Sequence, residues 1–229
     1  MEDTVFIWEV DSGKVLQKFE GHGLVSSVAF SPNGKKIITT DGNVTAIFGD
    51  GKIVRIWDVE TGKELHRFEG EDWDRIFSSA FFPDGKRILT ISGKRLDDPK
   101  LIPSTGIARI FDTEPDCASF GGELQKFEVK PGTHIRSAVL SPDGKKIVTA
   151  GGRDKTARIW DAESGKELQK FEHKPGINST AFSTGVNSAA FSSDGKRIVT
   201  AEDDTVRIWD AESGKELKKW AWTIHYWKN

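Results

Sequence analysis

The residues best suited to catalysis or metal binding are spread singly along this sequence. The histidines stand at positions 22, 66, 134, 173 and 225, and no two of them have the spacing of a metal-binding pair. The one cysteine, Cys117, excludes an internal disulfide and a cysteine-only metal cluster. The sequence also lacks a nucleophile-elbow motif and a cluster of unpaired carboxylates. We therefore expect no catalytic residue, no metal and no cofactor.

Asp-Gly and Asn-Gly pairs are the next candidates, because glycine-rich turns can hold phosphate groups. They recur at 33–34, 84–85, 143–144 and 194–195, each followed by a lysine. A phosphate site of this kind needs a helix directly after the turn, whose N-terminus binds the anion. No segment holds an apolar period of 3.6 residues long enough for a helix. Because these residues tolerate positive φ, the pairs predict β-hairpin turns instead.

These turns belong to a unit that the chain repeats. A phrase such as "SAAFSSDGKRIVTA" (188–201) is followed by a phrase such as "VRIWDAESGKELKKW" (206–220). Each phrase consists of short β-branched or aromatic segments bounded by turn residues, so the unit predicts four strands, which we name a, b, c and d in chain order. The aromatic residue of strand c recurs at Trp8, Trp57, Phe111, Trp160 and Trp209. The predicted fold class is all-β.

The overall composition fits a soluble globular protein. Of the 229 residues, 36% are hydrophobic and 30% are charged, with a net charge of −2, which gives no reason to expect a nucleic-acid partner. The apolar runs are too short to span a bilayer, and residues 1–20 do not resemble a signal peptide. We expect a cytoplasmic protein with no membrane partner. The basic pairs after the a–b turns lie near acids of the c–d turns, so we interpret them as solvated surface.

The repeated phrases resemble a known family. The "IWD" ending of strand c, the "SPDGK" turn and the "FEGH" link at 19–22 are similar to the WD-repeat (WD40) β-propellers, and the resemblance extends to residue 220. It implies a β-propeller of four full four-stranded blades plus an N-terminal half blade, an incomplete fifth blade. The chain is then a single domain, 1–229, with a half blade at 1–21, blades at 22–70, 71–129, 130–173 and 174–219, and a tail at 220–229.

The resemblance also assigns structural roles. The strand-c aromatic, at Trp8, Trp57, Phe111, Trp160 and Trp209, is expected to fill the space between blades. In the family, the Trp joins a network with a strand-b Ser or Thr, a turn Asp and the His of a "GH" link. Here His22 stands in such a link, and Asp154 and Asp203 match the turn Asp. The matching strand-b positions look like Gly152 and Ala201, while His134 and His173 are shifted. We therefore expect packing to hold these blades more than polar networks do.

The family resemblance implies a non-catalytic scaffold that binds a partner protein or peptide on the face formed by the b–c and d–a loops. The loops on that face differ most among the repeats. Trp73 is an exposed interface anchor or folds back onto the blade edge. We expect the charged stretch at 94–100 to be a solvated loop rather than a phosphate-binding site. The candidate partner-binding residues are Asp72, Trp73, Arg75, Lys94, Arg95, Asp97, Asp98, His134, Arg136 and Arg153.

The first blade of the chain begins at its third strand, which leaves several alternatives open. The tail at 220–229 offers one closing strand, so the protein is either a ring with a reduced fifth blade or a fragment of a larger propeller. The start inside a repeat favours truncation. A self-assembling unit, completed by another chain through open blade edges, is a further alternative. A hydrolase site at the central channel is the least favoured one.

One segment is duplicated. "GINSTAFST" (176–184) is followed at once by "GVNSAAFSS" (185–193). Because the second copy runs directly into an Asp-Gly turn, we expect it to form strand a of the last blade.

Overall fold

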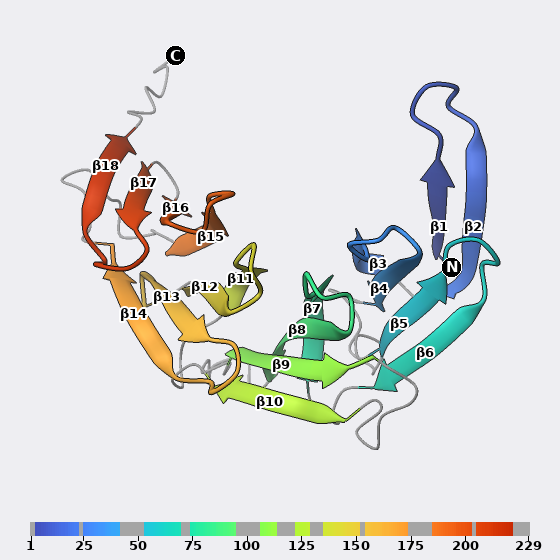
Figure 1. Cartoon of the computed structure of the whole chain (residues 1–229), viewed down its shortest axis with the longest axis horizontal. Coiled ribbons are helices and arrows are strands. Elements are labelled where there is room, and N and C mark those ends of the chain that lie inside the picture. Colours follow the sequence, from blue (N-terminus) through green and yellow to red (C-terminus); the bar gives the residue numbers. More distant parts are fainter. Residues whose placement is uncertain are drawn as a thin grey trace, which may run out of the picture. The chain divides into compact units, whose positions relative to one another are not determined.

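The computed structural model of the chain consists of β-strands in antiparallel sheets (Figure 1). It describes residues 3–22, 25–41, 53–69, 74–94, 106–113, 122–128, 135–151, 154–173, 185–202 and 205–221, and the statements below concern these residues. The chain divides into two compact units, Met1–Glu128 and Val129–Asn229, and each unit is described by itself. No helix in the described ranges is long and apolar enough to cross a bilayer.

The first unit contains a two-stranded sheet and two four-stranded sheets. The half blade is β1 (Asp3–Trp8) with β2 (Val15–His22). Blade 1 is β3 (Val25–Phe30), β4 (Lys36–Asp41), β5 (Ile53–Asp58) and β6 (Glu64–Glu69). Blade 2 is β7 (Asp74–Phe81), β8 (Arg87–Lys94), β9 (Gly106–Asp112) and β10 (Glu123–Glu128).

The second unit contains two further four-stranded sheets. Blade 3 is β11 (Ile135–Leu140), β12 (Lys146–Gly151), β13 (Thr156–Asp161) and β14 (Glu167–Glu172). Blade 4 is β15 (Val186–Phe191), β16 (Arg197–Glu202), β17 (Thr205–Asp210) and β18 (Glu216–Ala221). Strand a of blade 4 comes from the second copy of the duplication, as predicted, and the first copy lies outside the described residues.

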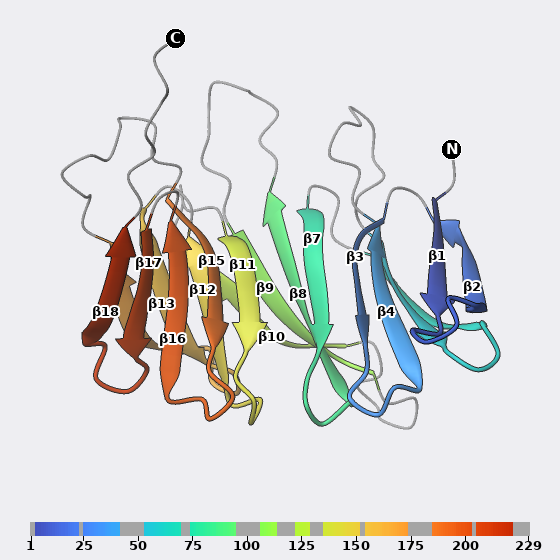
Figure 2. The same ribbon diagram turned by 90° about the horizontal axis from the view of Figure 1, so that it is seen from above.

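In every full blade the four strands pair in chain order, and Figure 2 shows the strands of each sheet side by side. The predicted all-β class, with four full blades and a half blade, is confirmed. The prediction of a single domain with the boundaries given above, including a closing strand at 220–229, stays a prediction.

The turns between strands a and b follow from their Asp-Gly or Asn-Gly pairs. In blade 1, Ser31 and Lys36 close the hairpin with a backbone hydrogen bond of 2.8 Å, and Gly34 adopts a φ of 70°. The Asn33 side chain accepts hydrogen bonds from the Ser31 hydroxyl at 2.8 Å and the Lys35 N–H at 3.0 Å. The side-chain bonds hold the turn in the conformation that glycine permits.

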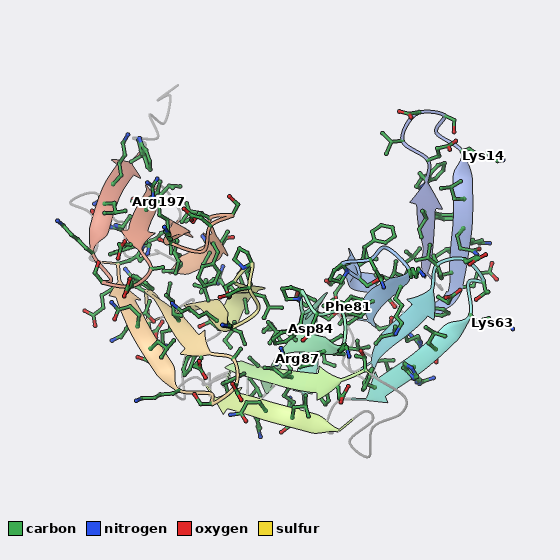
Figure 3. All side chains as sticks on the ribbon, in the orientation of Figure 1. Lys14, Lys63, Phe81, Asp84, Arg87 and Arg197 are labelled. Carbon is green, nitrogen blue, oxygen red and sulfur yellow. The ribbon has the colours of Figure 1, made fainter. Side chains whose placement is uncertain are left out.

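Blade 2 stabilises the same turn differently, because Phe82 replaces the serine. Phe82 is buried, and the Arg87 guanidinium lies 4.3 Å from its ring centroid. The Arg87 Nε also donates a hydrogen bond to Asp84 at 2.8 Å, and Figure 3 labels both residues in this turn. A cation–π contact and an ion pair thus take the place of the serine hydrogen bonds.

Two β-bulges interrupt each full blade. One lies near the start of strand a, where the pairing with strand b skips one residue in each blade: Ser26, Phe77, Arg136 and Asn187. The other lies near the start of strand d, at Leu65, Leu124, Leu168 and Leu217. A bulge disrupts the strand pairing locally and bends the strand that carries it.

The apolar core lies between adjacent blades. Phe19 of the half blade packs on Trp57 of blade 1, with ring centroids 5.7 Å apart, and Phe68 of blade 1 packs on Phe111 of blade 2 at 5.6 Å. In the second unit, Phe171 of blade 3 packs on Trp209 of blade 4 at 5.4 Å. Each contact joins a strand-d phenylalanine to the strand-c aromatic of the next blade, because a single sheet cannot cover its own two faces.

Candidate partner-binding site

The connections between strands fall at two ends of each sheet, and their lengths vary more at one end than at the other. At the end that we call the turn end, the a–b turns (31–35, 82–86, 141–145 and 192–196) all have the same length. The c–d turns there are also uniform, except for 113–122. At the opposite end, which we call the variable end, the b–c connection shortens from 42–52 and 95–105 to 152–155 and 203–204. The candidate partner-binding residues belong to the variable end.

Most of these candidates lie outside the described residues. These are Asp72, Trp73, Arg95, Asp97, Asp98, His134 and Arg153. The neighbouring residues Arg75 and Lys94 belong to paired strands, where Arg75 faces Gly93 and Lys94 faces Asp74 in the ladder. Their predicted role in partner binding stays a prediction.

Arg136 is the candidate whose side chain is described. It occupies the strand-a bulge of blade 3 at the variable end, and it is exposed. Its Nη1 donates a hydrogen bond of 2.9 Å to Oδ1 of Asn187, which occupies the equivalent bulge of blade 4. An exposed cation and an amide from two blades are therefore held side by side where they can meet a ligand.

Asn187 was not among the residues predicted from the sequence. The signal was present, because aligning "IRSAVLS" (135–141) with "VNSAAFS" (186–192) places Asn187 opposite Arg136. The bulge that brings both side chains to the same end is a feature of strand pairing, which that alignment alone does not reveal.

A buried polar network joins blades 3 and 4. Trp209 Nε1 donates a hydrogen bond to the Thr200 hydroxyl at 2.8 Å, and His173 Nε2 lies 2.8 Å from the same oxygen. On the other side of the imidazole, Nδ1 contacts Arg207, whose Nη1 also donates to Glu202 at 3.2 Å. Nδ1 also lies 3.2 Å from Glu202 Oε2, so this nitrogen contacts both a donor and an acceptor, and either tautomer of neutral His173 can bond the Thr200 hydroxyl through Nε2.

This network corrects the sequence alignment. Gly152 and Ala201 were expected at the strand-b position of the network. The strand-b hydroxyls that accept from the tryptophans instead belong to Thr149 and Thr200. Trp160 Nε1 donates to Thr149 at 2.9 Å. His173, expected to be shifted, lies at 2.8 Å from Thr200. Blade 4 therefore has a connected polar network as well as packing.

The surroundings of His173 favour its neutral form. Burial, followed by the charge of Arg207, lowers the pKa of His173 to about 4, although Glu202 acts in the opposite direction. A neutral imidazole at physiological pH fits the role of hydrogen-bond bridge between blades, and it leaves no exposed nitrogen for acid–base chemistry.

The strand-c tryptophans of the other blades vary in their partners. Trp57 Nε1 donates to Thr39 at 2.9 Å. In blade 2 the aromatic is Phe111, which is half-buried against Phe68 and has no N–H to donate. Trp8 in the half blade is 56% exposed within the single chain, and its expected place between blades stays a prediction.

The remaining structural candidates are partly described. Asp154 accepts hydrogen bonds from Arg158 Nη2 at 2.7 Å and from the Thr156 hydroxyl at 2.8 Å, so it anchors the b–c connection of blade 3. His22 ends β2, but its side chain lies outside the described residues, as does Asp203.

A buried arginine in strand c of every full blade was missed by sequence reasoning. Each one forms an ion pair through Nε with the first glutamate of strand d, as Arg109 does with Glu123 at 2.9 Å. Each also contacts an acidic or hydroxyl group at the variable end, as Arg109 Nη1 does with Ser92 at 2.8 Å. The four arginines are Arg55, Arg109, Arg158 and Arg207.

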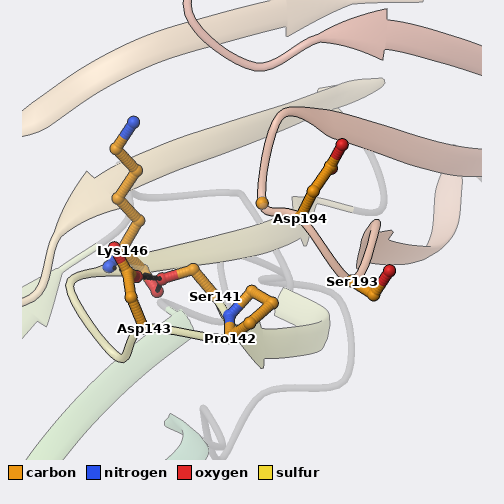
Figure 4. Close-up of a pocket in the computed structure, with 7 residues that line it drawn as sticks. Ser141, Pro142, Asp143, Lys146, Ser193 and Asp194 are labelled. Atoms are coloured by element: carbon orange, nitrogen blue, oxygen red, sulfur yellow. Dashed lines mark hydrogen bonds between the residues drawn. The ribbon is translucent and has the colours of Figure 1, made fainter.

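A shallow cavity of about 360 Å³ lies at the turn end of blades 3 and 4 (Figure 4). It holds two carboxylates, Asp143 and Asp194, and both are engaged in their own turns. The hydrogen bond from the Ser141 hydroxyl, at 2.6 Å, is the main cause that lowers the pKa of Asp143, and the Ser192 hydroxyl acts in the same way on Asp194. Two ionised turn-forming carboxylates do not provide the acid and base that hydrolysis needs.

Metal binding has no candidate in the part of the chain that the structure describes. No group of three or more His, Cys, Asp or Glu side chains there is arranged to hold an ion.

Comparison with known proteins identifies the repeat. The family model described as WD domain, G-beta repeat, matches residues 13–58, 122–161 and 165–210. The first three strands of blade 2, β7 to β9, with Phe82, Phe111 and the 95–105 connection, fall outside these matches, whereas β10 lies within the second one. No curated protein matches the chain.

Many solved structures match the fold, and two of them show how far the sequences differ. A chain in the crystal structure of the mitotic checkpoint complex matches with a TM-score of 0.69 and 19% identity, over 96% of this chain and 60% of that chain. The β-propeller domain of Myceliophteria thermophila Cps50 (Swd1) matches with a TM-score of 0.62 and 16% identity, over 90% of this chain and 58% of that one. The chain therefore spans less than two thirds of both relatives, and the likeness concerns the fold alone.

Proposed function

Because the chain belongs to the WD40-repeat family of β-propellers, we propose that it is a non-catalytic scaffold that binds a partner protein or peptide at its variable end. Propellers of this family commonly mediate protein–protein interaction, and they are generally not enzymes. The proposal for this chain goes further, because it names the face that binds.

The observation that carries the proposal is the contrast between the two ends of the sheets. At the turn end only the c–d connection of blade 2 departs from the common length of the full blades, while the b–c and d–a connections differ from blade to blade. Connections that vary on a rigid frame are the usual place for recognition, since the frame fixes their positions and their sequences set the specificity.

The Arg136–Asn187 pair adds a described contact to this argument. The guanidinium is exposed and offers several N–H donors, and the hydrogen bond to Asn187 limits its freedom before a ligand arrives. A carboxylate or a backbone carbonyl of a peptide is the complementary group, because arginine donates to oxygen acceptors and cannot accept.

A displayed random peptide library, selected on the full chain, tests the proposal without knowledge of the natural partner. Peptides that bind the wild type should bind at least about tenfold more weakly to Arg136→Ala, or to a variant whose 95–105 connection is replaced by Asp-Asp. Lys145→Ala with Lys196→Ala, at the turn end, is the matched control and should leave binding unchanged. Peptides that lose affinity for the control and keep it for the variable-end variants would place the binding face at the other end and refute the proposal.

A further inference from the structure

Among the residues that the structure describes, two apolar surfaces are more exposed than the equivalent surfaces elsewhere in the repeats. The first is the face of the half blade that carries Phe6 and Trp8, which are 42% and 56% exposed. Two of the residues equivalent to Trp8, Trp57 and Trp209, are only 6% and 5% exposed because a phenylalanine of the preceding blade packs on each.

The second surface lies on blade 4, on the side opposite Trp209, and it carries Trp220. In the ladder Trp220 pairs with Val206, as Phe171 pairs with Ala157 and Phe19 with Val5. Trp220 therefore occupies the position of the phenylalanines that cover the next blade, but it is 39% exposed. Its neighbour Val199 is 38% exposed, while the equivalent Val148 of blade 3 is fully buried.

We propose that these two surfaces bind each other between copies of the chain, so that blade 4 of one molecule packs on the half blade of a second copy. Trp220 then covers Trp8 as Phe171 covers Trp209 within the chain. A second copy is the occupant that the repeats favour, because it presents a face built in the same register as the faces that already pack together. The interface continues an apolar packing that the described blades use within each unit.

Charge at the edge of the two surfaces supports the same pairing. Within the chain, Gln17 of strand d reaches the c–d turn of the next blade and donates to the Glu60 carbonyl at 3.1 Å. Lys218 stands at the equivalent position of blade 4, since it pairs with Ile208 as Gln17 pairs with Ile7. The c–d turn that it would meet carries the exposed acids Glu9 and Asp11. A lysine in place of glutamine thus matches an acidic turn.

The predicted contact is heterologous, because different surfaces meet at each end. Such head-to-tail contacts close into rings or continue into filaments, whereas a symmetric dimer uses one surface twice. This distinction gives the proposal a sharp test, because breaking either surface leaves each molecule with one intact partner surface.

Sedimentation velocity of the purified full chain over a wide range of concentrations is the measurement. The wild type should form species heavier than a monomer whose share rises with concentration. Trp8→Glu and Trp220→Glu should each sediment as monomers, and an equimolar mixture of the two should form a one-to-one dimer. Leu168→Glu, an exposed apolar residue outside both surfaces, should assemble like the wild type. Far-UV circular dichroism checks that every variant is folded.

Several outcomes would overturn the proposal. If the wild type stays monomeric at every concentration, the two surfaces bind each other within one chain or bind a different protein. Self-association that survives Trp220→Glu but not Trp8→Glu indicates a symmetric contact between half blades. If Trp220→Glu does not fold, Lys218→Glu and Asp11→Lys replace the test, since each should weaken assembly and their mixture should restore it.

Discussion

His173 and Trp209 meet at a single oxygen, the hydroxyl of Thr200. Their ring centroids are 5.5 Å apart. Nε2 of His173 and Nε1 of Trp209 each lie 2.8 Å from the hydroxyl oxygen of Thr200. His173 follows the last strand of blade 3, whereas the other two residues belong to blade 4. A polar link therefore crosses the same blade boundary as the apolar contact between Phe171 and Trp209, and the stability of that boundary depends on both.

The first prediction concerns pH. The pKa of His173 is lowered from 6.5 to about 4 in the folded protein, so between these values the unfolded chain binds more protons than the folded one. Stability therefore rises with pH across this window: the contribution of neutral His173 is fully present above pH 6.5 and is lost as the pH falls towards 4. The loss amounts to about 3 kcal/mol. Urea unfolding at a series of pH values measures it.

The matched control for pH is His173→Gln, which keeps a hydrogen-bonding side chain but does not titrate. Its stability should depend less on pH than that of the wild type between pH 4 and 6.5. Identical slopes for the two proteins would show that His173 is not the group responsible.

The second prediction concerns the shared hydroxyl. Thr200→Val keeps the shape of the side chain but removes the hydroxyl that hydrogen-bonds Trp209 Nε1 and His173 Nε2, so we expect a loss of about 3 kcal/mol in the free energy of unfolding. Thr90→Val is the control, because Thr90 is buried at the equivalent ladder position, opposite Arg109, and the strand-c aromatic of its blade is Phe111, which has no N–H to donate. Chemical denaturation of both variants should give a loss below about 1 kcal/mol for Thr90→Val.

The third prediction concerns the buried arginines. Arg207→Met removes the cation beside Glu202, a carboxylate that is itself buried, so we expect a loss of about 3–5 kcal/mol in the free energy of unfolding. Adding Glu202→Gln should recover part of this loss, because the uncompensated charge is then absent. A double variant no more stable than Arg207→Met alone would show that the cost comes from packing.

The strand order and the turns could be predicted from the sequence because their signals are local. Asn33-Gly34 and its equivalents form the predicted hairpins, since positive φ and side-chain bonds to the turn are properties of adjacent residues. The aromatic of strand c also identified the inter-blade contacts at Trp57 and Trp209, because a repeated bulky residue needs a repeated partner surface.

The buried polar groups could not be predicted in the same way. Arg207 stands in "VRIWD", where a charged residue in a short strand usually faces solvent, and its burial depends on the ladder that places Glu216 beside it. The contact of His173 with Thr200 depends on how two blades stack, which residue spacing alone does not determine. The structure around the candidate binding residues could not be predicted for a different reason. Most of these residues lie in connections whose sequences are not repeated from blade to blade.

The last prediction concerns the packing between blades. Phe171 is 1% exposed and fills the space against Trp209, so Phe171→Ala should leave a cavity at the boundary of blades 3 and 4 and cost about 3–5 kcal/mol. Leu168→Ala in the same strand is the control, and it should change stability by less than about 0.5 kcal/mol, because Leu168 is exposed at a bulge. Urea unfolding of both variants is the measurement. Comparable losses for the two would mean that strand d is held by its ladder and not by contact with the next blade, which would contradict the stacking that this fold requires.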